Sequence, residues 1–459
     1  MTGSEQLVTV RPPQPHEAHT ARATLLWSSA YVIVVVAPLF ALLPGLGPGR
    51  GFTWDLSMAL GYAAMSMFGV QFWLTARFKR ATAPFGIDLV YYFHRYLALF
   101  ALALAIVHVV VLAAVHPAAI ALDLRVVPAH VAAGMLSLAL LAVVVVLSLA
   151  RRQLRIAYER WRWTHALLAT LGFALAAWHL FGSGRYLDTA WKQALWAGYL
   201  GFWAALIVHV RLLRPWGVLR RPWRVQAVRP EHGHVWTLVL EPGGERTPPL
   251  RFSPGQFAWL TLRASPLAMR EHPFSIASSS ESPRRIELSI KALGDFSASI
   301  GSVQPGETAW LDAPYGTFGV DRCPHARSLV FVAGGIGIAP ILSMLRTLAD
   351  RADRADRRPM LLVYGNRVWD RVAFREELDA LARRLDLRIV HTLLEPPGDW
   401  CGEQGFVTEA MLGRHLPSAG QRCEVFICGP TPMTTQVEQA LAALKLPASQ
   451  VHSEIFDWV

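Results

Sequence analysis

Four histidines in the first half of the chain have the type and spacing of paired metal ligands. His94 and His108 stand fourteen positions apart, and so do His165 and His179. Fourteen residues of helix are just under four turns, so each pair projects from one helix face with about 21 Å of rise between its members. Imidazole is a common metal ligand, and haem iron accepts it axially. Two such helices can hold two stacked haems.

The alternative is that these histidines are hydrogen-bonded packing residues. One pair at this spacing could arise by chance among sixteen histidines. Two equally spaced pairs within apolar segments are harder to dismiss, since ionisable groups at membrane depth are expensive and usually functional. We therefore predict two b-type haems, one held by His94 with His165 and the other by His108 with His179.

Two short motifs in the second half contain the groups that a flavin site needs. They are His272-Pro273-Phe274-Ser275 and Gly294-Asp295-Phe296-Ser297. A hydroxyl can donate to the reactive ring nitrogen, an aromatic or imidazole can lie on the ring or ribityl chain, and free amides before a helix can cradle a pyrophosphate. We expect FAD here, with Ser275 as a catalytic donor and Lys291 among the cofactor-binding residues.

A glycine loop stands between a predicted strand and a predicted helix, the context of a phosphate-binding loop: Gly334-Gly335-Ile336-Gly337-Ile338-Ala339-Pro340. Proline replaces the third glycine of the Rossmann fingerprint, and a simple tight turn is the structural alternative. Arg367 follows the next strand, where it can pair with a ribose 2′-phosphate or stack on adenine. NADPH is therefore favoured, and NADH stays open.

The remaining candidates lie near the C-terminus. Cys428-Gly429-Pro430 closes a later strand, where a small backbone allows nicotinamide to approach the flavin. Phe456 and Trp458 can each cover the flavin until nicotinamide displaces them, and we favour Phe456. Cys428 and Phe456 join Ser275 as expected catalytic residues.

Composition separates the chain into a membrane half and a soluble half. Hydrophobic residues make up 53% of the chain and the mean hydropathy is +0.31, with the excess confined to the first half. Apolar runs predict a bundle of six membrane spans, at about 24–43, 55–75, 94–115, 127–150, 163–182 and 189–210. Residues 1–22 are polar and are expected to form a cytosolic tail.

The net charge of +11 follows the membrane topology and does not indicate nucleic-acid binding. Arginines cluster in the second, fourth and final loops, which places both termini in the cytoplasm of a plasma (bacterial inner) membrane. His94 and His165 then lie near the cytoplasmic face. Loop arginines can pair with haem propionates or act only as topology signals. Two histidines at the outer span ends can serve an acceptor or be solvated: His116 and His130.

After Arg224 the pattern changes to alternating strands, which predicts a small antiparallel β-barrel. From Leu329 strands alternate with helices, which predicts a parallel α/β sheet. We expect four regions: the tail, a transmembrane domain at 23–214, an FAD-binding barrel at 222–322 and an NAD(P)H-binding domain at 323–459. The four cysteines fit neither a disulfide framework nor an iron–sulfur cluster.

These motifs, in this order, carry a family resemblance. The first half resembles the ferric reductase transmembrane domain, and HPFS, GDFS, GGIGIAP, YGNR and CGP make the second half similar to a ferredoxin–NADP reductase-type module. Together, 23–459 resembles a prokaryotic member of the NADPH oxidase/ferric reductase superfamily. The resemblance implies FAD at both flavin motifs, haem on the four histidines, and nicotinamide-nucleotide contacts at Gly335, Gly337, Pro340, Arg367 and Cys428.

The function expected from this resemblance is transmembrane electron transfer from NAD(P)H through FAD and two haems to an outer acceptor. The acceptor can be oxygen, as in an NADPH oxidase, or ferric iron, as in a ferric reductase. An electron-donor subunit for a partner redox protein, a quinone reductase and a haem-binding sensor are the alternatives. No EF-hand motif precedes the first span, so calcium control is not expected.

Overall fold

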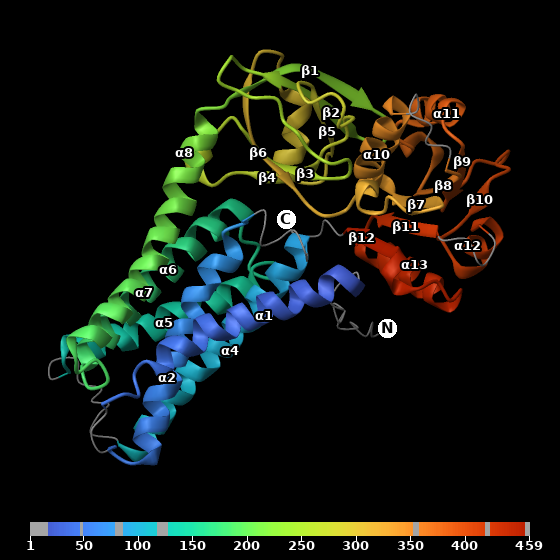
Figure 1. Ribbon diagram of the computed structural model, residues 1–459. Helices are drawn as coiled ribbons and strands as arrows, with labels where there is room; N and C mark the ends of the chain where they lie inside the picture. The colour runs from blue at the N-terminus through green and yellow to red at the C-terminus, as the bar shows by residue number, and fades with distance from the viewer. Residues whose placement is uncertain are drawn as a thin grey trace. The chain divides into compact units, whose positions relative to one another are not determined.

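The computed structural model describes residues 17–45, 49–78, 86–116, 127–351, 358–417 and 423–454. The chain divides into two compact units, one spanning Ala18–Arg214 and the other beginning at Pro215. Figure 1 shows the first as a set of long helices and the second as two sheets with their helices. The expected tail at 1–22 falls largely outside the described residues.

The first unit is built from long apolar helices: α1 (Glu17–Phe40), α2 (Phe52–Thr75), α4 (Gly86–Val115), α5 (Ala129–Ala150), α6 (Tyr158–Ser183) and α7 (Ala190–Val208). A π-helical turn, η2 (His209–Leu213), carries the chain from α7 into α8 (Arg214–Leu219). Within the described ranges, four stretches are long and apolar enough to cross a membrane, namely Leu89–Val115, Ala129–Ala150, Tyr158–Ser183 and Ala190–Leu219. Leu25–Phe40 is a shorter apolar helix, so the count of six spans stays a prediction.

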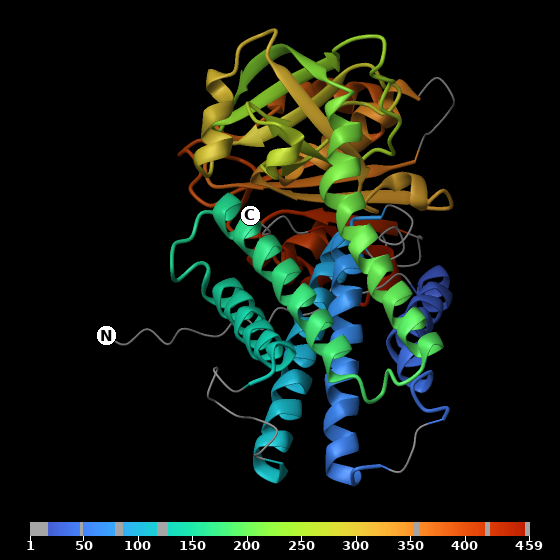
Figure 2. The same cartoon turned by 90° about the vertical axis from the view of Figure 1, so that its left-hand side faces the viewer.

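Close helix approaches hold this unit together. α2 packs along α4, and α5 packs along α6; these helices run as long neighbouring rods in Figure 2. Trp196 and Trp203 of α7 are fully buried in the core. A Cβ at Gly69 of α2 would lie 2.5 Å from the Trp203 indole nitrogen, so glycine is required for α2 to pack against this indole.

The second unit starts with an antiparallel sheet of β1 (Trp223–Glu231), β2 (Val235–Pro242), β3 (Phe257–Leu262), β4 (His272–Ser275), β5 (Ile286–Lys291) and β6 (Thr308–Tyr315). Its strand order is β4-β3-β6-β1-β2-β5. An isolated antiparallel bridge joins Ile276, just after β4, to Leu288 of β5. The strands expected from alternation are present; a closed barrel stays a prediction.

A parallel sheet follows, made of β7 (Ser328–Gly334), β8 (Met360–Asn366), β9 (Leu387–Leu393), β10 (Glu403–Gln404), β11 (Cys423–Cys428) and β12 (Val451–Glu454). The strand order is β10-β9-β8-β7-β11-β12. Strands β8 to β10 are added on one side of β7 and strands β11 and β12 on its other side, so the strand order reverses at β7. All residues of β7 are buried, as expected for a strand covered on both faces. The covering helices are α10 (Ile338–Asp350), α11 (Arg375–Arg384), α12 (Glu409–His415) and α13 (Thr431–Ala443).

The two sheets are joined through a partly buried arginine on α10, Arg346. The Arg346 guanidinium donates to both oxygens of Glu377 at 2.6 and 2.8 Å, to Glu287 of β5 at 2.9 Å and to the Ala277 carbonyl at 2.9 Å. Burial alone would raise the pKa of Glu287, but the nearby guanidinium groups, Arg346 foremost, hold it below its usual value. The two sheets are therefore linked by a hydrogen-bonded network of charged side chains centred on Arg346.

We expect Arg346→Met to lower the stability of the second unit by about 1.5–3 kcal/mol, because it removes charge-assisted hydrogen bonds to Glu287 and Glu377 while Arg229 and Arg285 still pair with Glu287. Arg384→Met is the matched control: Arg384 is exposed and 3.8 Å from Asp350, so its loss should cost less than about 1 kcal/mol. The melting temperature of the full chain, followed by flavin release, measures both. Equal melting of the two variants would contradict the role assigned to Arg346.

Candidate functional site

The helical unit brings the four histidines together in two pairs. His94 of α4 faces His165 of α6 with ring centres 6.2 Å apart, and His108 faces His179 with ring centres 6.4 Å apart. The spacing along α4 and α6 therefore places the pairs at two levels of one bundle. An iron bonded to two imidazoles at about 2 Å each would separate the ring centres by about 6 Å. The donor set and its spacing fit a bis-histidine haem at each level.

Hydrogen bonds fix which ring nitrogen His108 and His179 can offer to a metal. His108 Nδ1 lies 2.8 Å from the Ser57 carbonyl oxygen, and His179 Nδ1 lies 2.9 Å from the His130 carbonyl oxygen. A carbonyl oxygen only accepts, so each Nδ1 carries the proton. Nε2 then keeps its lone pair, which is the state a metal ligand requires.

His165 reaches the same state through a serine hydroxyl. Ser148 Oγ donates to the Val144 carbonyl at 2.7 Å and lies 3.1 Å from His165 Nδ1. Because its one proton is already used, Ser148 must accept from His165 Nδ1. Trp161 also donates to this hydroxyl at 3.3 Å. His94 differs, since its Nδ1 is buried and has no hydrogen-bond partner among the described residues.

Two glycines make room for the pair formed by His108 and His179. A Cβ at Gly61 would lie 3.3 Å from the His108 ring, and a Cβ at Gly134 would lie 2.7 Å from the His179 ring. Sequence reasoning missed these glycines, as well as Ser57 and Ser148, because they lie on other helices and share no spacing with the histidines. Small residues in apolar helices were the available signal.

His116 and His130, which the sequence predicts at the outer ends of the spans, occupy different surroundings. His130 stacks beside His179 with ring centres 6.3 Å apart, and its carbonyl already orients that histidine. His116 packs edge-on against Trp54 with ring centres 5.0 Å apart, and the Arg50 guanidinium lies over the Trp54 ring at 4.9 Å from its centre. A contact of either histidine with an acceptor stays a prediction.

In the second unit, the two flavin motifs pack against each other. Phe296 stacks on His272 with ring centres 3.9 Å apart and on Phe274 at 6.0 Å. Ser297 Oγ accepts from the Gly294 amide at 2.9 Å and caps the short helix α9 (Asp295–Ser299). The Ser297 hydroxyl thus shapes its own loop. The resulting layer of aromatic and imidazole rings suits a planar ligand.

The glycine loop packs directly on the Cys428-Gly429-Pro430 turn. A Cβ at Gly337 would collide with the Cys428 carbonyl oxygen, and one at Gly334 would lie 2.5 Å from Met433 Sδ. Gly335 has φ +53°, which favours glycine. Both turns end neighbouring parallel strands, β7 and β11, at the reversal of strand order where such sheets bind ligands. Pro340 lies in the first turn of α10.

Two charged side chains join this edge. Lys291, at the end of β5, places its Nζ 3.7 Å from where a Gly335 Cβ would stand. Burial and nearby Arg371 lower the pKa of Lys291, so an anionic phosphate would stabilise its charged form. Sequence reasoning missed Glu454, which is buried. It pairs with Cys428 across strands β11 and β12, and its carboxylate lies close to Gly316.

Ser275 is the last residue of β4 and pairs in register with Phe257 of β3. Phe257 in turn pairs with Tyr315, next to Gly316. Ser275 therefore belongs to the same side of the second unit as Glu454. The expected flavin cover, Phe456 or Trp458, lies outside the described residues.

Arg367 follows β8 at the nucleotide-binding edge of the sheet, as expected, but it faces a carboxylate. Its guanidinium lies 2.9 Å from Glu395 Oε1, which follows β9. The Glu395 amide also donates to the Arg367 carbonyl at 2.8 Å, so the backbone holds the pair in place. A carboxylate here can accept from a ribose 2′-hydroxyl and would repel a 2′-phosphate.

Comparisons with known proteins agree with this arrangement. Three family models match: ferric reductase like transmembrane component over 60–177, FAD-binding domain over 239–308 and oxidoreductase NAD-binding domain over 331–439. Among curated proteins, the propane 2-monooxygenase reductase component of Mycolicibacterium smegmatis is 33% identical over 51% of this chain and 66% of its own length. NADH-cytochrome b5 reductase 1 of Pyricularia oryzae is 30% identical over 39% of this chain and 60% of its own.

The chain thus spans about three fifths to two thirds of these relatives' own length. Among solved structures, the cytochrome b5 reductase domain of Ulva prolifera nitrate reductase is 18% identical, with a TM-score of 0.45 over 51% of this chain and 96% of that domain.

The matching family models define a chain that combines a transmembrane component with an FAD-binding domain and an oxidoreductase NAD-binding domain. Its membrane half is ferric reductase-like. The chain has the NADPH oxidase/ferric reductase-type architecture, which confirms the resemblance seen in its sequence.

We expect Glu395→Gln to shift coenzyme preference toward NADPH, because it removes a negative charge facing the 2′ position. For an exposed pair of this kind the ratio of kcat/KM for NADPH to that for NADH should rise about threefold to tenfold. Glu245→Gln, an exposed carboxylate of the antiparallel sheet region, should leave the ratio unchanged. Steady-state reduction of ferricyanide by each coenzyme measures it, and an unchanged ratio in Glu395→Gln would refute the assignment.

Proposed function

We propose that the chain transfers electrons across a membrane from cytosolic NAD(P)H, through FAD and two b-type haems, to an acceptor on the outer side. The single observation that carries this proposal is the pair of facing histidines at each of two levels of the helical bundle. FAD, when bound, converts hydride transfer into single-electron transfer, and haem iron accepts one electron at a time.

The histidine surroundings support ligation better than packing. A packing histidine uses its ring nitrogens for protein hydrogen bonds. Here Nδ1 of His108, His165 and His179 is held by an acceptor on a neighbouring helix, which leaves Nε2 as the metal-binding atom. We assign His94 and His165 to the inner haem, and His108 and His179 to the outer haem, with both termini cytoplasmic.

In the second unit, we assign the flavin to His272–Ser275, Lys291 and Gly294–Ser297. The coenzyme is assigned to Gly334, Gly335, Gly337, Pro340, Arg367 and Cys428-Gly429. Ser275 would donate to the flavin ring, and Cys428, whose side chain is fully buried, would bound the space for nicotinamide. Phe456 would cover the flavin until the coenzyme arrives. The domain limits proposed are 23–214, 222–322 and 323–459.

The outer acceptor distinguishes the possible activities. Oxygen would make the protein a superoxide-producing oxidase, and a ferric chelate would make it an iron reductase. A second candidate, an electron donor to a partner redox protein, is favoured by the similarity to a curated protein described as a reductase component.

The test of the proposed function uses detergent-purified protein with added FAD. NADH and NADPH are supplied separately without oxygen while the haem α-band is recorded, and then air or ferric citrate is admitted. We expect the band to appear with a coenzyme and to decay at the turnover rate with the true acceptor. Decay with neither favours the donor role, and failure of both coenzymes to produce the band would refute the proposal.

We expect His94→Ala or His165→Ala to halve the haem content and stop acceptor reduction, while FAD content and coenzyme-driven ferricyanide reduction persist. Removing one axial ligand leaves the inner haem with a single protein bond. His209→Ala is the control, because His209 stacks on Phe78 at 6.2 Å and belongs to neither pair. Haem content is measured by the pyridine haemochrome, and full content in either ligand variant would contradict the assignment.

A further inference from the structure

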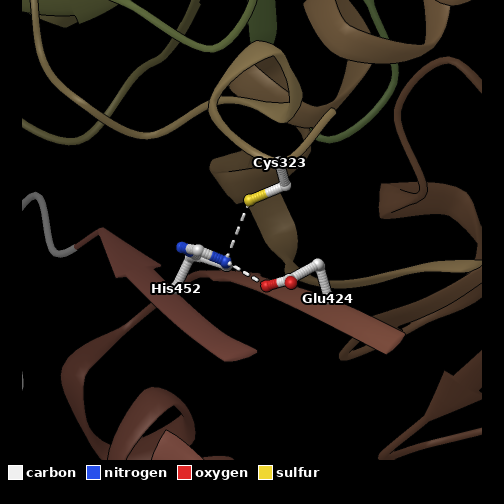
Figure 3. Close-up of side chains that lie close together, drawn as sticks. All are labelled: Cys323, Glu424 and His452. Carbon is white, nitrogen blue, oxygen red and sulfur yellow. Dashed lines mark hydrogen bonds and ion pairs between the residues drawn. The ribbon is translucent and has the colours of Figure 1, made fainter. Parts of the chain in front are cut away.

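A cluster of three potential metal ligands lies in the second unit, formed by Cys323, Glu424 and His452. Figure 3 shows the three side chains pointing toward one another from separate segments. Cys323 follows the short helix η5 (Val320–Arg322) in the segment between β6 and β7, Glu424 is on β11, and His452 is on the neighbouring strand β12. Their ligand atoms all lie within 4.8 Å of one another.

One histidine nitrogen faces both other ligands. His452 Nε2 lies 2.9 Å from Glu424 Oε2 and 3.4 Å from Cys323 Sγ. Two zinc-bound atoms at the tetrahedral angle would be separated by about 3.3–3.5 Å, given zinc–nitrogen and zinc–oxygen bonds near 2.0 Å and a zinc–sulfur bond near 2.3 Å. The observed distances differ from this range by only a few tenths of an ångström.

Without an ion, hydrogen bonds would join the three side chains. Nε2 carries at most one proton, which it can donate to the carboxylate, and the Cys323 thiol has a proton of its own to donate. A cation bound to the three atoms would take the place of these protons.

The surroundings hold the ligands in position. Glu424 and His452 are only 5% and 9% exposed. Phe426 stacks on the His452 ring with centres 4.6 Å apart and planes 11° apart, which orients Nε2 along the sheet face. Cys323 is half-buried, so it forms the solvent-facing side of the cluster.

We propose that Cys323, Glu424 and His452 form a binding site for one Zn²⁺ ion. Thiolate, imidazole and carboxylate together match zinc, which accepts sulfur, nitrogen and oxygen ligands. The thiolate and carboxylate charges balance the ion. The site would tie the segment between the two sheets to the edge strand β12 and thereby fix the C-terminal part of the second unit. It lies near the amino ends of β11 and β12, away from Cys428, and is independent of the haem proposal.

The test uses the full chain in detergent, stripped with EDTA, dialysed and then equilibrated with Zn²⁺ alone. Zinc per chain is measured by inductively coupled plasma mass spectrometry, and affinity by competition with a chromogenic chelator. We expect one zinc per chain. X-ray absorption at the zinc edge should show one sulfur at about 2.3 Å and nitrogen or oxygen neighbours at about 2.0–2.1 Å.

Three variants and one control assign the site. Cys323→Ser, Glu424→Gln and His452→Gln should each weaken zinc binding by more than about 100-fold, since losing a direct ligand exceeds the loss of an outer-shell partner. Cys401→Ser is the control, because Cys401 is exposed and its thiol donates only to the nearby Asp399 carbonyl. FAD content and ferricyanide reduction verify that each variant is folded.

The outcomes separate cleanly. One zinc in the wild type and in Cys401→Ser, lost from folded Cys323→Ser and His452→Gln, supports the site. Wild-type protein that retains less than about a tenth of an equivalent at micromolar Zn²⁺, or zinc content unaffected in the Cys323 and His452 variants, would overturn it. A zinc shell without sulfur would overturn it as well. Failure of the haem proposal would leave each of these results unchanged.

Discussion

The proton on Nδ1 of the bundle histidines is the constraint on which the helical unit's proposed chemistry depends. A neutral imidazole has its lone pair at Nε2 when the ring proton is on Nδ1, and a hydrogen bond from Nδ1–H to an acceptor holds it in that state. The Ser57 and His130 carbonyls and the Ser148 hydroxyl supply that acceptor for three of the four rings. Each acceptor lies on a helix other than the ring's own, so the ligand state of α4 and α6 depends on α2 and α5 being packed in register.

The same dependence explains the small residues of the bundle. Glycine at 61 and at 134 leaves space for an imidazole where a methyl group would press on it. Association of apolar helices in a membrane depends largely on close packing, and small residues at the interface allow the helices to approach closely while leaving space for a ring. Gly61 and Gly134 therefore serve both the close packing of the helices and the placement of the histidine rings.

The second unit uses a charged counterpart of this arrangement. Arg346 joins α10, α11 and β5 through hydrogen bonds to two carboxylates, and this fixes the antiparallel sheet against the parallel one. The flavin motifs on β4 and α9 and the glycine loop after β7 lie on elements held by this junction. The proposed hydride transfer requires the coenzyme and the flavin to be positioned to within about 1 Å, and this junction connects the elements that would bind them.

The sequence by itself determined the element types, the pairing of His94 with His165 and His108 with His179, and the position of the glycine loop. The element types and the glycine loop follow from local periodicity, because helix and strand repeats appear in neighbouring residues. The histidine pairing follows from the predicted topology, in which both spans run in the same direction. Only the tertiary structure decided which side chains orient those groups. Ser148 beneath His165, Glu395 beside Arg367, and Glu424 with His452 and Cys323 are contacts between distant segments. Such contacts depend on how elements pack, which no local pattern encodes.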